Sequence, residues 1–188
     1  GVTTLDASGN GNVGTITGSA WTTNGKIGDA LSFSTISDRL SINSSASLNN
    51  ASAISTSAWI KSNNVSQEQT IISRNGPFFL RISANRLRIG IHTDGVWTFI
   101  NGGILLTSGT WNYVVLTYDG SLMKSYINGI LDTSTTKTGN FSSFSNLYFG
   151  YPVPNGENYT FNGIIDDVRI YSRSLSLSEI QSIYNAGK

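Results

Sequence analysis

Short segments of alternating apolar and polar residues, separated at regular intervals by turn residues, run along almost the whole chain. Such alternation is typical of strands with one buried face. The pairs Asp119-Gly120 and Asn128-Gly129 mark tight hairpin turns. We expect an all-β, two-sheet antiparallel sandwich with one late helix. Its eleven strands are expected at residues 30–33, 39–42, 54–61, 69–73, 78–83, 86–92, 96–100, 111–118, 123–127, 146–150 and 164–171.

Length and charge narrow the class of protein. The 188 residues fit one domain, residues 1–188, of the larger all-β kind. Charged residues make up 12% of the chain and the formal net charge is +1, so nothing global favours nucleic acid or an anionic membrane. No segment approaches the run of about 20 apolar residues that membrane insertion needs. The lack of cysteine excludes disulfides and thiolate chemistry, and it favours a prokaryotic or viral source.

The last thirty residues predict a strand that closes a sheet, followed by a short C-terminal helix. Ile164, Val168 and Ile170 alternate on one face of this strand. Asp166 is in phase with them, and a carboxylate on an apolar face needs hydrogen bonds, an ion pair or a metal ion. Residues 176–179 (Ser-Leu-Ser-Glu) form a capping box, which marks the start of the helix.

Five further motifs follow one another in a specific order along nearly the whole chain. They are Asp-Ala-Ser-Gly-Asn-Gly-Asn at 6–12, Gly-Asp-Ala-Leu-Ser-Phe at 28–33, Ile-Ser-Thr-Ser-Ala-Trp-Ile-Lys at 54–61, Gly-Thr-Trp-Asn-Tyr-Val-Val-Leu-Thr-Tyr-Asp-Gly at 109–120 and Tyr-Ile-Asn-Gly at 126–129. Together with the closing segment they resemble laminin-G-like modules of the concanavalin A-like lectin/glucanase family. The resemblance implies a jelly roll of two curved sheets.

The start of the chain departs from that family pattern. Family members usually carry another strand, with an aromatic and an acidic residue, before the turn at 6–12, whereas only Gly-Val-Thr-Thr-Leu precedes it here. An unpaired sheet edge is a liability that proteins usually cover. We therefore expect this module to be part of a larger protein, or a neighbouring chain to act as strand donor.

The number and spacing of acidic residues disfavour an enzyme. Retaining glycoside hydrolysis needs two carboxyl groups about 5–5.5 Å apart. Before the C-terminal helix the only glutamates are Glu68 and Glu157, and neither has an acidic neighbour two or four residues away. Asp166 and Asp167 are adjacent, so they should point to opposite faces of their strand. The one histidine, His92, cannot form a histidine-rich metal site.

Calcium is the metal that the sequence allows, because turn-rich β-modules supply carboxylate and backbone oxygens. Laminarinase-like relatives hold a structural calcium partly through an aspartate in a strand similar to residues 166–171, so the resemblance implies Asp166 as a ligand. Asp6 and Asp38 are the other candidate ligands. The alternative is that Asp166 caps loop amides or pairs with an arginine such as Arg39 or Arg169.

Aromatic residues near turns predict a sugar-binding surface. Trp97 follows the turn at Asp94-Gly95, and Tyr151 and Tyr159 flank the loop at 152–158. Trp59 is out of phase with its apolar neighbours and could face away from the core. Because Trp59 and Trp111 occupy landmark positions of the resembled family, a structural role is favoured for both.

Basic residues gather on one predicted strand face. Arg86, Arg88 and His92 share one phase of the strand at 86–92, opposite its leucine and isoleucines. A row of guanidinium groups suits carboxylate or sulfate groups, as on uronic or sulfated polysaccharides. The alternative is a solvated face that keeps the sheet soluble. We include Arg88 and His92 among the candidate ligand-binding residues.

These observations favour a non-catalytic carbohydrate-binding or adhesion module of an extracellular or surface-exposed protein, with polysaccharide or glycoconjugate as partner. The alternative is a structural or decorating domain of a surface filament, surface layer or virion that acts through protein–protein packing. A glycoside hydrolase ranks third. Proteins that share a fold can have many different functions, so the function must be inferred from the residues of the binding site.

Overall fold

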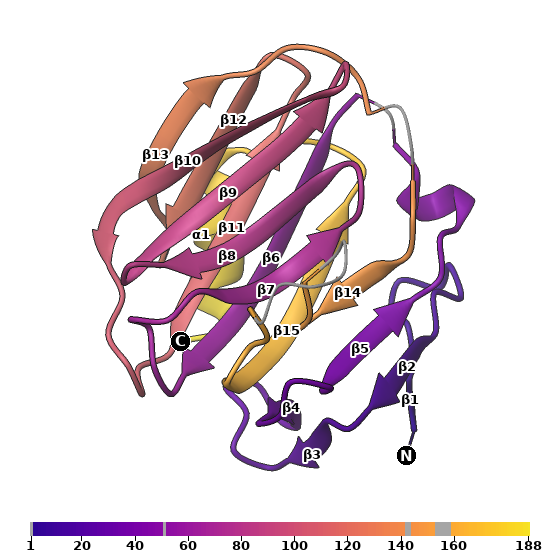
Figure 1. Ribbon diagram of the computed structural model, residues 1–188, viewed down its shortest axis with the longest axis vertical. Coiled ribbons are helices and arrows are strands. Elements are labelled where there is room, and N and C mark those ends of the chain that lie inside the picture. The colour runs from indigo at the N-terminus through magenta and orange to yellow at the C-terminus, as the bar shows by residue number, and fades with distance from the viewer. Residues whose placement is uncertain (1, 51, 142–143, 153–158) are drawn as a thin grey trace.

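The computed structural model describes residues 2–50, 52–141, 144–152 and 159–188, which form two facing antiparallel sheets with one α-helix packed behind one of them (Figure 1). The predicted all-β sandwich with a late helix is confirmed. The eight-stranded sheet has the order β1 (Thr3–Thr4), β2 (Gly14–Thr17), β5 (Arg39–Ile42), β14 (Leu147–Phe149), β7 (Gln69–Arg74), β8 (Phe78–Ser83), β9 (Arg86–Thr93) and β10 (Val96–Leu105).

The seven-stranded sheet lies behind it in Figure 1 and carries the helix on its far side. Its order is β13 (Ile130–Thr136), β12 (Leu122–Ile127), β11 (Asn112–Tyr118), β6 (Ile54–Ser62), β15 (Gly163–Tyr171), β4 (Ala30–Phe33) and β3 (Ala20–Thr22). The α-helix α1 spans Leu177–Ala186, and a 3₁₀ turn spans Ala46–Leu48. No helix in the described part of the chain has the length and apolar content of a membrane span.

All eleven predicted strands are present, with ends shifted by one residue in most cases. Strand β10 runs five residues further than predicted, because a register irregularity between Asn101 and Leu105 carries it past two glycines. Strands β1, β2, β3 and β13 were not predicted. The first three have two to four residues, too few to show a period. Strand β13 is an edge strand rich in threonine, so no apolar alternation marks it.

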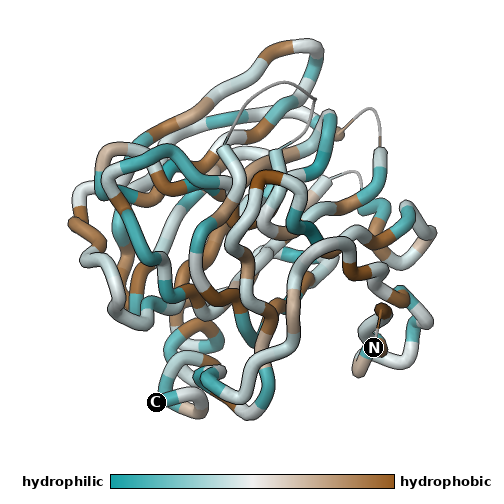
Figure 2. The backbone as a smooth tube through the Cα atoms, turned by 60° about the horizontal axis from the view of Figure 1, so that its bottom comes forward, coloured by the Kyte–Doolittle hydropathy of each residue, from teal (hydrophilic) through white to brown (hydrophobic). Residues whose placement is uncertain are grey.

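Apolar side chains alternate inward along most strands and fill the space between the sheets; the tube in Figure 2 changes repeatedly between brown and teal for this reason. Leu80, Ile89 and Leu116 are fully buried in this core. A second cluster lies between the seven-stranded sheet and α1, where the Trp59 ring is 5.4 Å from the Tyr113 ring. Trp59 therefore faces away from the inter-sheet core, but α1 covers it and its role is structural.

The closing strand β15 departs from its predicted phase in its first half, whereas Val168 and Ile170 pack against the inter-sheet core as predicted. Ile165, and not Ile164, belongs to the inter-sheet core. Asp166 stands opposite Trp59 in the register, so it lies on the face that α1 covers. A bulge follows, at which Asp167 has a φ of 42°. The capping box of α1 is confirmed, since the Ser176 side chain accepts a hydrogen bond from the backbone of Glu179.

Candidate binding face and pocket

Two tight turns set the register of strands β8, β9 and β10. The turn residues Ala84, Asn85 and Asp94 have φ of 49°, 62° and 53°, and Gly95 has a φ of 76°. Positive φ at both central residues is the type I′ geometry that suits two-residue hairpins. The turns pair Trp97 with His92 across β9 and β10. A local backbone signal thus brings together two of the predicted ligand-binding residues.

Alternation then separates the two faces of β9. Leu87, Ile89 and Ile91 are fully buried in the core, so Arg86, Arg88 and His92 point outward, as predicted. On β8 the outward residues are Phe79 and Arg81, and on β10 they are Trp97 and Phe99. We call the outward side chains that contact one another the platform: Phe79, Arg81, Arg88, His92, Trp97 and Phe99.

Aromatic rings cover one end of the platform. The Trp97 ring lies 5.1 Å from the His92 ring and 5.3 Å from the Phe79 ring. Trp97 is 38% exposed and Phe99 is 55% exposed. Large apolar side chains left exposed together on one sheet face point to a binding surface.

A glycine in mid-strand lets the Phe79 ring lie flat on this face. Gly90 stands directly opposite both Phe79 and Phe99 in the register. A Cβ atom at Gly90 would lie only 2.3 Å from the Phe79 ring. The absence of a side chain at Gly90 therefore makes room for the ring, a close approach of the kind that glycine in a strand often marks.

Two arginines extend the platform beyond the aromatic end. The Arg81 guanidinium lies 4.6 Å from the Phe79 ring and 5.4 Å from the Tyr159 ring. The Arg88 guanidinium lies 4.3 Å from the Phe99 ring. These are cation–π distances. The two arginines face each other in the register, and such like-charged pairs are destabilising unless they are compensated.

Glu68 supplies compensation for Arg88. Its Oε1 lies 3.1 Å from Arg88 Nη1 and also accepts a hydrogen bond of 2.8 Å from the Ser83 hydroxyl. Arg86, in contrast, is used by the fold, because its guanidinium donates to the carbonyl groups of Gly102 and Gly103 at the bulge of β10. The predicted basic row is thus divided between a binding face and a structural contact.

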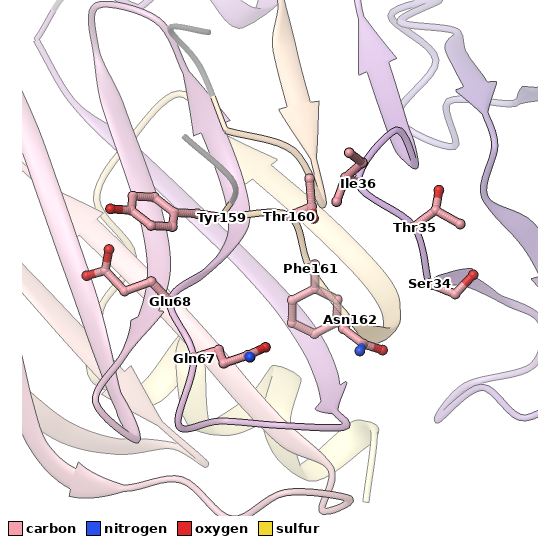
Figure 3. A pocket seen from close by; sticks show the side chains of 9 residues that line it. All are labelled: Ser34, Thr35, Ile36, Gln67, Glu68, Tyr159, Thr160, Phe161 and Asn162. Carbon is pink, nitrogen blue, oxygen red and sulfur yellow. The ribbon is translucent and has the colours of Figure 1, made fainter. Parts of the chain in front are cut away.

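A pocket of about 630 Å³ opens beside Tyr159, at the end of the platform that Arg81 reaches. Figure 3 shows Tyr159 and Glu68 on one side of it and the loop after β4 on the other. Three segments form its walls, namely the loop between β4 and β5, the end of the loop between β6 and β7, and the segment before β15. The lining residues are Ser34, Thr35, Ile36, Gln67, Glu68, Tyr159, Thr160, Phe161 and Asn162.

Asp38 holds the first wall in place. Its Oδ2 accepts hydrogen bonds from the backbone of Ser34 at 2.7 Å and of Thr35 at 3.0 Å, and Oδ1 accepts one from the Thr35 hydroxyl at 2.5 Å. Burial raises the pKa of the Asp38 carboxyl, but these bonds from Thr35 and Ser34 outweigh it, so the pKa lies below its ordinary value.

Gln69 and its neighbour hold the opposite wall. Gln69 Oε1 accepts a 2.9 Å hydrogen bond from the backbone of Asn162, and the backbone N–H of Thr70 donates to the Tyr159 carbonyl at 2.6 Å. The Phe161 N–H donates to the Gly150 carbonyl. The segment that carries Tyr159 is therefore fixed to the start of β7.

The predicted ligand-binding residues are brought together in part. Trp97, His92 and Arg88 share the platform, and Tyr159 joins it through Arg81. Tyr151 lies elsewhere on the sheet, with its ring 6.2 Å from the Tyr148 ring and beneath the Arg39 guanidinium.

Sequence reasoning missed Phe79, Phe99 and Gly90 as members of this surface. A signal for Phe99 was available, because it lies two residues after Trp97 and so shares its face. Phe79 and Gly90 meet only through the pairing of two strands, which the sequence does not display.

The predicted calcium ligands sit in separate turns. Asp6 binds Ser8 and the backbone of Asn12, and Asp38 fixes the pocket wall. Asp166 Oδ2 accepts hydrogen bonds from the backbone of Lys26 at 2.7 Å and of Ile27 at 2.8 Å.

Among the described residues, no three His, Cys, Asp or Glu side chains gather into a metal site. In these positions the three carboxylates do not fit one shared calcium centre. The hydrogen bonds that Asp166 accepts from the backbone of Lys26 and Ile27 agree with the alternative that it caps loop amides. Calcium binding stays a prediction.

The carboxylates also bear on catalysis. Glu68 is the one carboxylate among the described platform and pocket residues, and Arg88 and Ser83 bind one of its oxygens. Glycoside hydrolysis uses a pair of carboxyl groups. Glu157 lies outside the described residues. The adjacent residues Asp166 and Asp167 have separate roles, since Asp167 pairs with Arg169 while Asp166 caps a loop.

Comparison with known proteins places this sandwich in a family. The model of the concanavalin A-like lectin/glucanases superfamily matches residues 33–181. The chain belongs to this superfamily. A search of curated proteins returns no match. The family assignment confirms the resemblance drawn from the six sequence motifs.

Solved structures share the fold along nearly the whole chain. The binding domain of Paraclostridial Mosquitocidal Protein 1 matches with a TM-score of 0.81 and 19% identity, covering 97% of this chain and 49% of that one. Domain 4 of AbnA, an extracellular arabinanase from Geobacillus stearothermophilus solved in complex with arabinotriose, matches with a TM-score of 0.76 and 22% identity, covering 95% of this chain and 91% of that domain.

A structure of botulinum neurotoxin type C, described as dependent on two ganglioside molecules for cell entry, matches with a TM-score of 0.76 and 20% identity, over 98% of this chain and 48% of that one. This chain therefore spans about half the length of the matched toxin domains. Identities this low show a shared fold.

Proposed function

We propose that this chain is a non-catalytic glycan-binding module of an extracellular or surface-exposed protein and that the platform is its binding face. The observation that carries the proposal is the gathering of Trp97, Phe79, Phe99 and His92 beside two arginines on one solvent-facing side of a sheet. Aromatic faces stack on the apolar faces of sugar rings, and guanidinium groups donate hydrogen bonds to their oxygens.

Proteins with the same fold support the proposal, since one was solved with a bound arabinose trisaccharide and another depends on gangliosides for cell entry. A solved structure that matches 97% of this chain is described as a binding domain, which supports a binding role without catalysis.

The test is binding to a panel of neutral, uronic and sulfated polysaccharides, measured for the wild type, Trp97→Ala and Trp21→Ala. Trp21 is a matched control because it is 45% exposed but lies on β3 of the other sheet. We expect saturable binding to one class, weakened at least tenfold (about 1.4 kcal/mol) by Trp97→Ala and unchanged by Trp21→Ala. Repeating the panel with calcium and with a chelator tests the predicted metal, since loss of binding with chelator would place calcium in or beneath the site.

If both tryptophan variants bind as the wild type does, the binding site lies outside the platform. No binding to any polysaccharide would favour the alternative, a structural module that acts through protein–protein packing. One observation favours that alternative: the two-residue edge strand β1 is flanked by Val2 and Leu5, which are 74% and 91% exposed. A strand donated by a neighbouring chain could pair there.

A further inference from the structure

The pocket beside the platform has chemistry of its own. We infer that it is a second saccharide subsite, which takes one neutral sugar unit from a chain end or a side branch. The inference rests on the proposed function and deepens it, because it names the kind of glycan that the whole surface selects. The platform alone is an open sheet face, whereas the pocket has walls from three separate segments (Figure 3).

The pocket has room for a sugar unit and lies beside the platform. The volume of about 630 Å³ falls in the range of small-ligand sites, about 300–1,000 Å³. A chain that lay across the platform would meet the pocket at Tyr159, since Arg81 contacts both the Phe79 ring and the Tyr159 ring. A unit that ends a chain or branches from it could turn into the pocket there.

The lining fits a sugar. Tyr159 and Ile36 stand on opposite sides in Figure 3 and offer an aromatic ring and an aliphatic group to the C–H faces of a pyranose or furanose. The polar lining consists of hydroxyl and amide side chains, which can both donate and accept hydrogen bonds. These are Ser34, Thr35, Gln67, Thr160 and Asn162.

Charge favours a neutral unit. Glu68 is the only charged side chain among the nine lining residues that the structure describes. Arg88 and Ser83 both bind its Oε1. A uronic carboxylate or a sulfate would find no lysine or arginine among these described lining residues to pair with, and it would lie near the Glu68 carboxylate. Hydroxyl groups could donate hydrogen bonds to it.

The walls are held before any ligand arrives. Asp38 and Gln69 are each 2% exposed, and their side chains fix the Ser34–Thr35 and Asn162 backbones on opposite sides of the pocket. Hydrogen bonds from these loop backbones to two buried polar side chains keep the pocket in one shape. Preorganisation of this kind lowers the entropic penalty of binding.

The test compares matched oligosaccharides on a printed glycan panel: linear neutral chains with free ends, the same chains with capped ends, singly branched neutral chains, and chains that end in a uronic acid. The pocket variant is Ile36→Ser combined with Gln67→Ala, since both side chains are exposed and neither belongs to the platform. Ile130→Ser is the matched control, because Ile130 is 63% exposed and lies on β13 of the other sheet. Circular dichroism confirms that each variant is folded.

We expect the wild type to prefer free neutral ends or branches at least tenfold over capped linear chains, and the pocket variant to lose that preference while its binding to capped chains stays within twofold. If the pocket variant loses the preference for linear chains with free ends, the pocket binds a chain end. If it loses the preference for branched chains, the pocket binds a side branch. A preference for acidic ends, or a pocket variant that behaves like the wild type, would overturn the inference alone. If the wild type binds no member, the proposed function falls with it.

Discussion

Single buried polar residues shape the pocket, and Asp38 is the one whose ionisation bears on stability. Its carboxylate accepts four hydrogen bonds from the backbone and hydroxyl groups of Ser34 and Thr35. Because its pKa in the folded chain lies below the ordinary value of 3.8, the charged form stabilises the fold above that pH. This contribution is lost as the pH falls through the lowered pKa.

Asp38→Asn should lower the free energy of unfolding at pH 6 by about 2 kcal/mol, the size of hydrogen bonds to a charged group. The difference from the wild type should shrink below pH 4, where the wild type also loses its charge. Urea unfolding across this pH range measures both. Asp29→Asn, in the exposed loop before β4, is the control. A difference that stays constant down to pH 2 would show that the Asp38 charge contributes nothing.

The prediction of single residues from sequence succeeded where the signal was local. Alternation was enough to place Arg88 and His92 on one face, whereas the position of Trp97 opposite His92 comes from the strand register. Asp166 was placed on the wrong face, because the bulge at Asp167 needs a positive φ that its residue type alone does not announce. The distant partners of Asp166, the amides of Lys26 and Ile27, lie 140 and 139 residues away in sequence.

At the scale of elements, β9 supplies both a wall of the core and the floor of the platform. Its inward residues are fully buried, and its outward face holds Gly90 beneath the Phe79 ring. Gly90 has no positive φ, so the backbone there could accept alanine. The requirement for glycine is therefore one of space above the strand.

Gly90→Ala should push the Phe79 ring off the sheet and weaken glycan binding severalfold, while the free energy of unfolding changes by less than about 1 kcal/mol. The stability change is small for two reasons. The Phe79 ring can swing toward solvent, and alanine loses less backbone entropy on folding than glycine does. In a Phe79→Ala background the same substitution should not weaken binding further. Equal losses in both backgrounds would mean that Gly90 acts on something other than the ring.

At the scale of the whole molecule, the two sheets differ in how much of each is buried. The seven-stranded sheet is covered by the other sheet on one side and by α1 on the other, and every residue of β11 is buried. The eight-stranded sheet keeps one side open, and the platform and pocket lie there. The order of strands in the sheets could not be predicted from the sequence. Strand β14 lies between β5 and β7, although some 70 residues or more separate it from either in the chain.

This asymmetry predicts where the fold opens first. Amides of β6 and β11 should exchange with solvent only through global unfolding, because their strands are central and buried on both faces. Amides of β1 and β2, at the edge of the eight-stranded sheet, should exchange much faster through local opening. Hydrogen exchange followed by mass spectrometry measures both. A glycan bound on the platform should slow exchange in β8–β10 and leave β6 unchanged, whereas uniform exchange across both sheets would contradict a rigid two-faced scaffold beneath an open binding face.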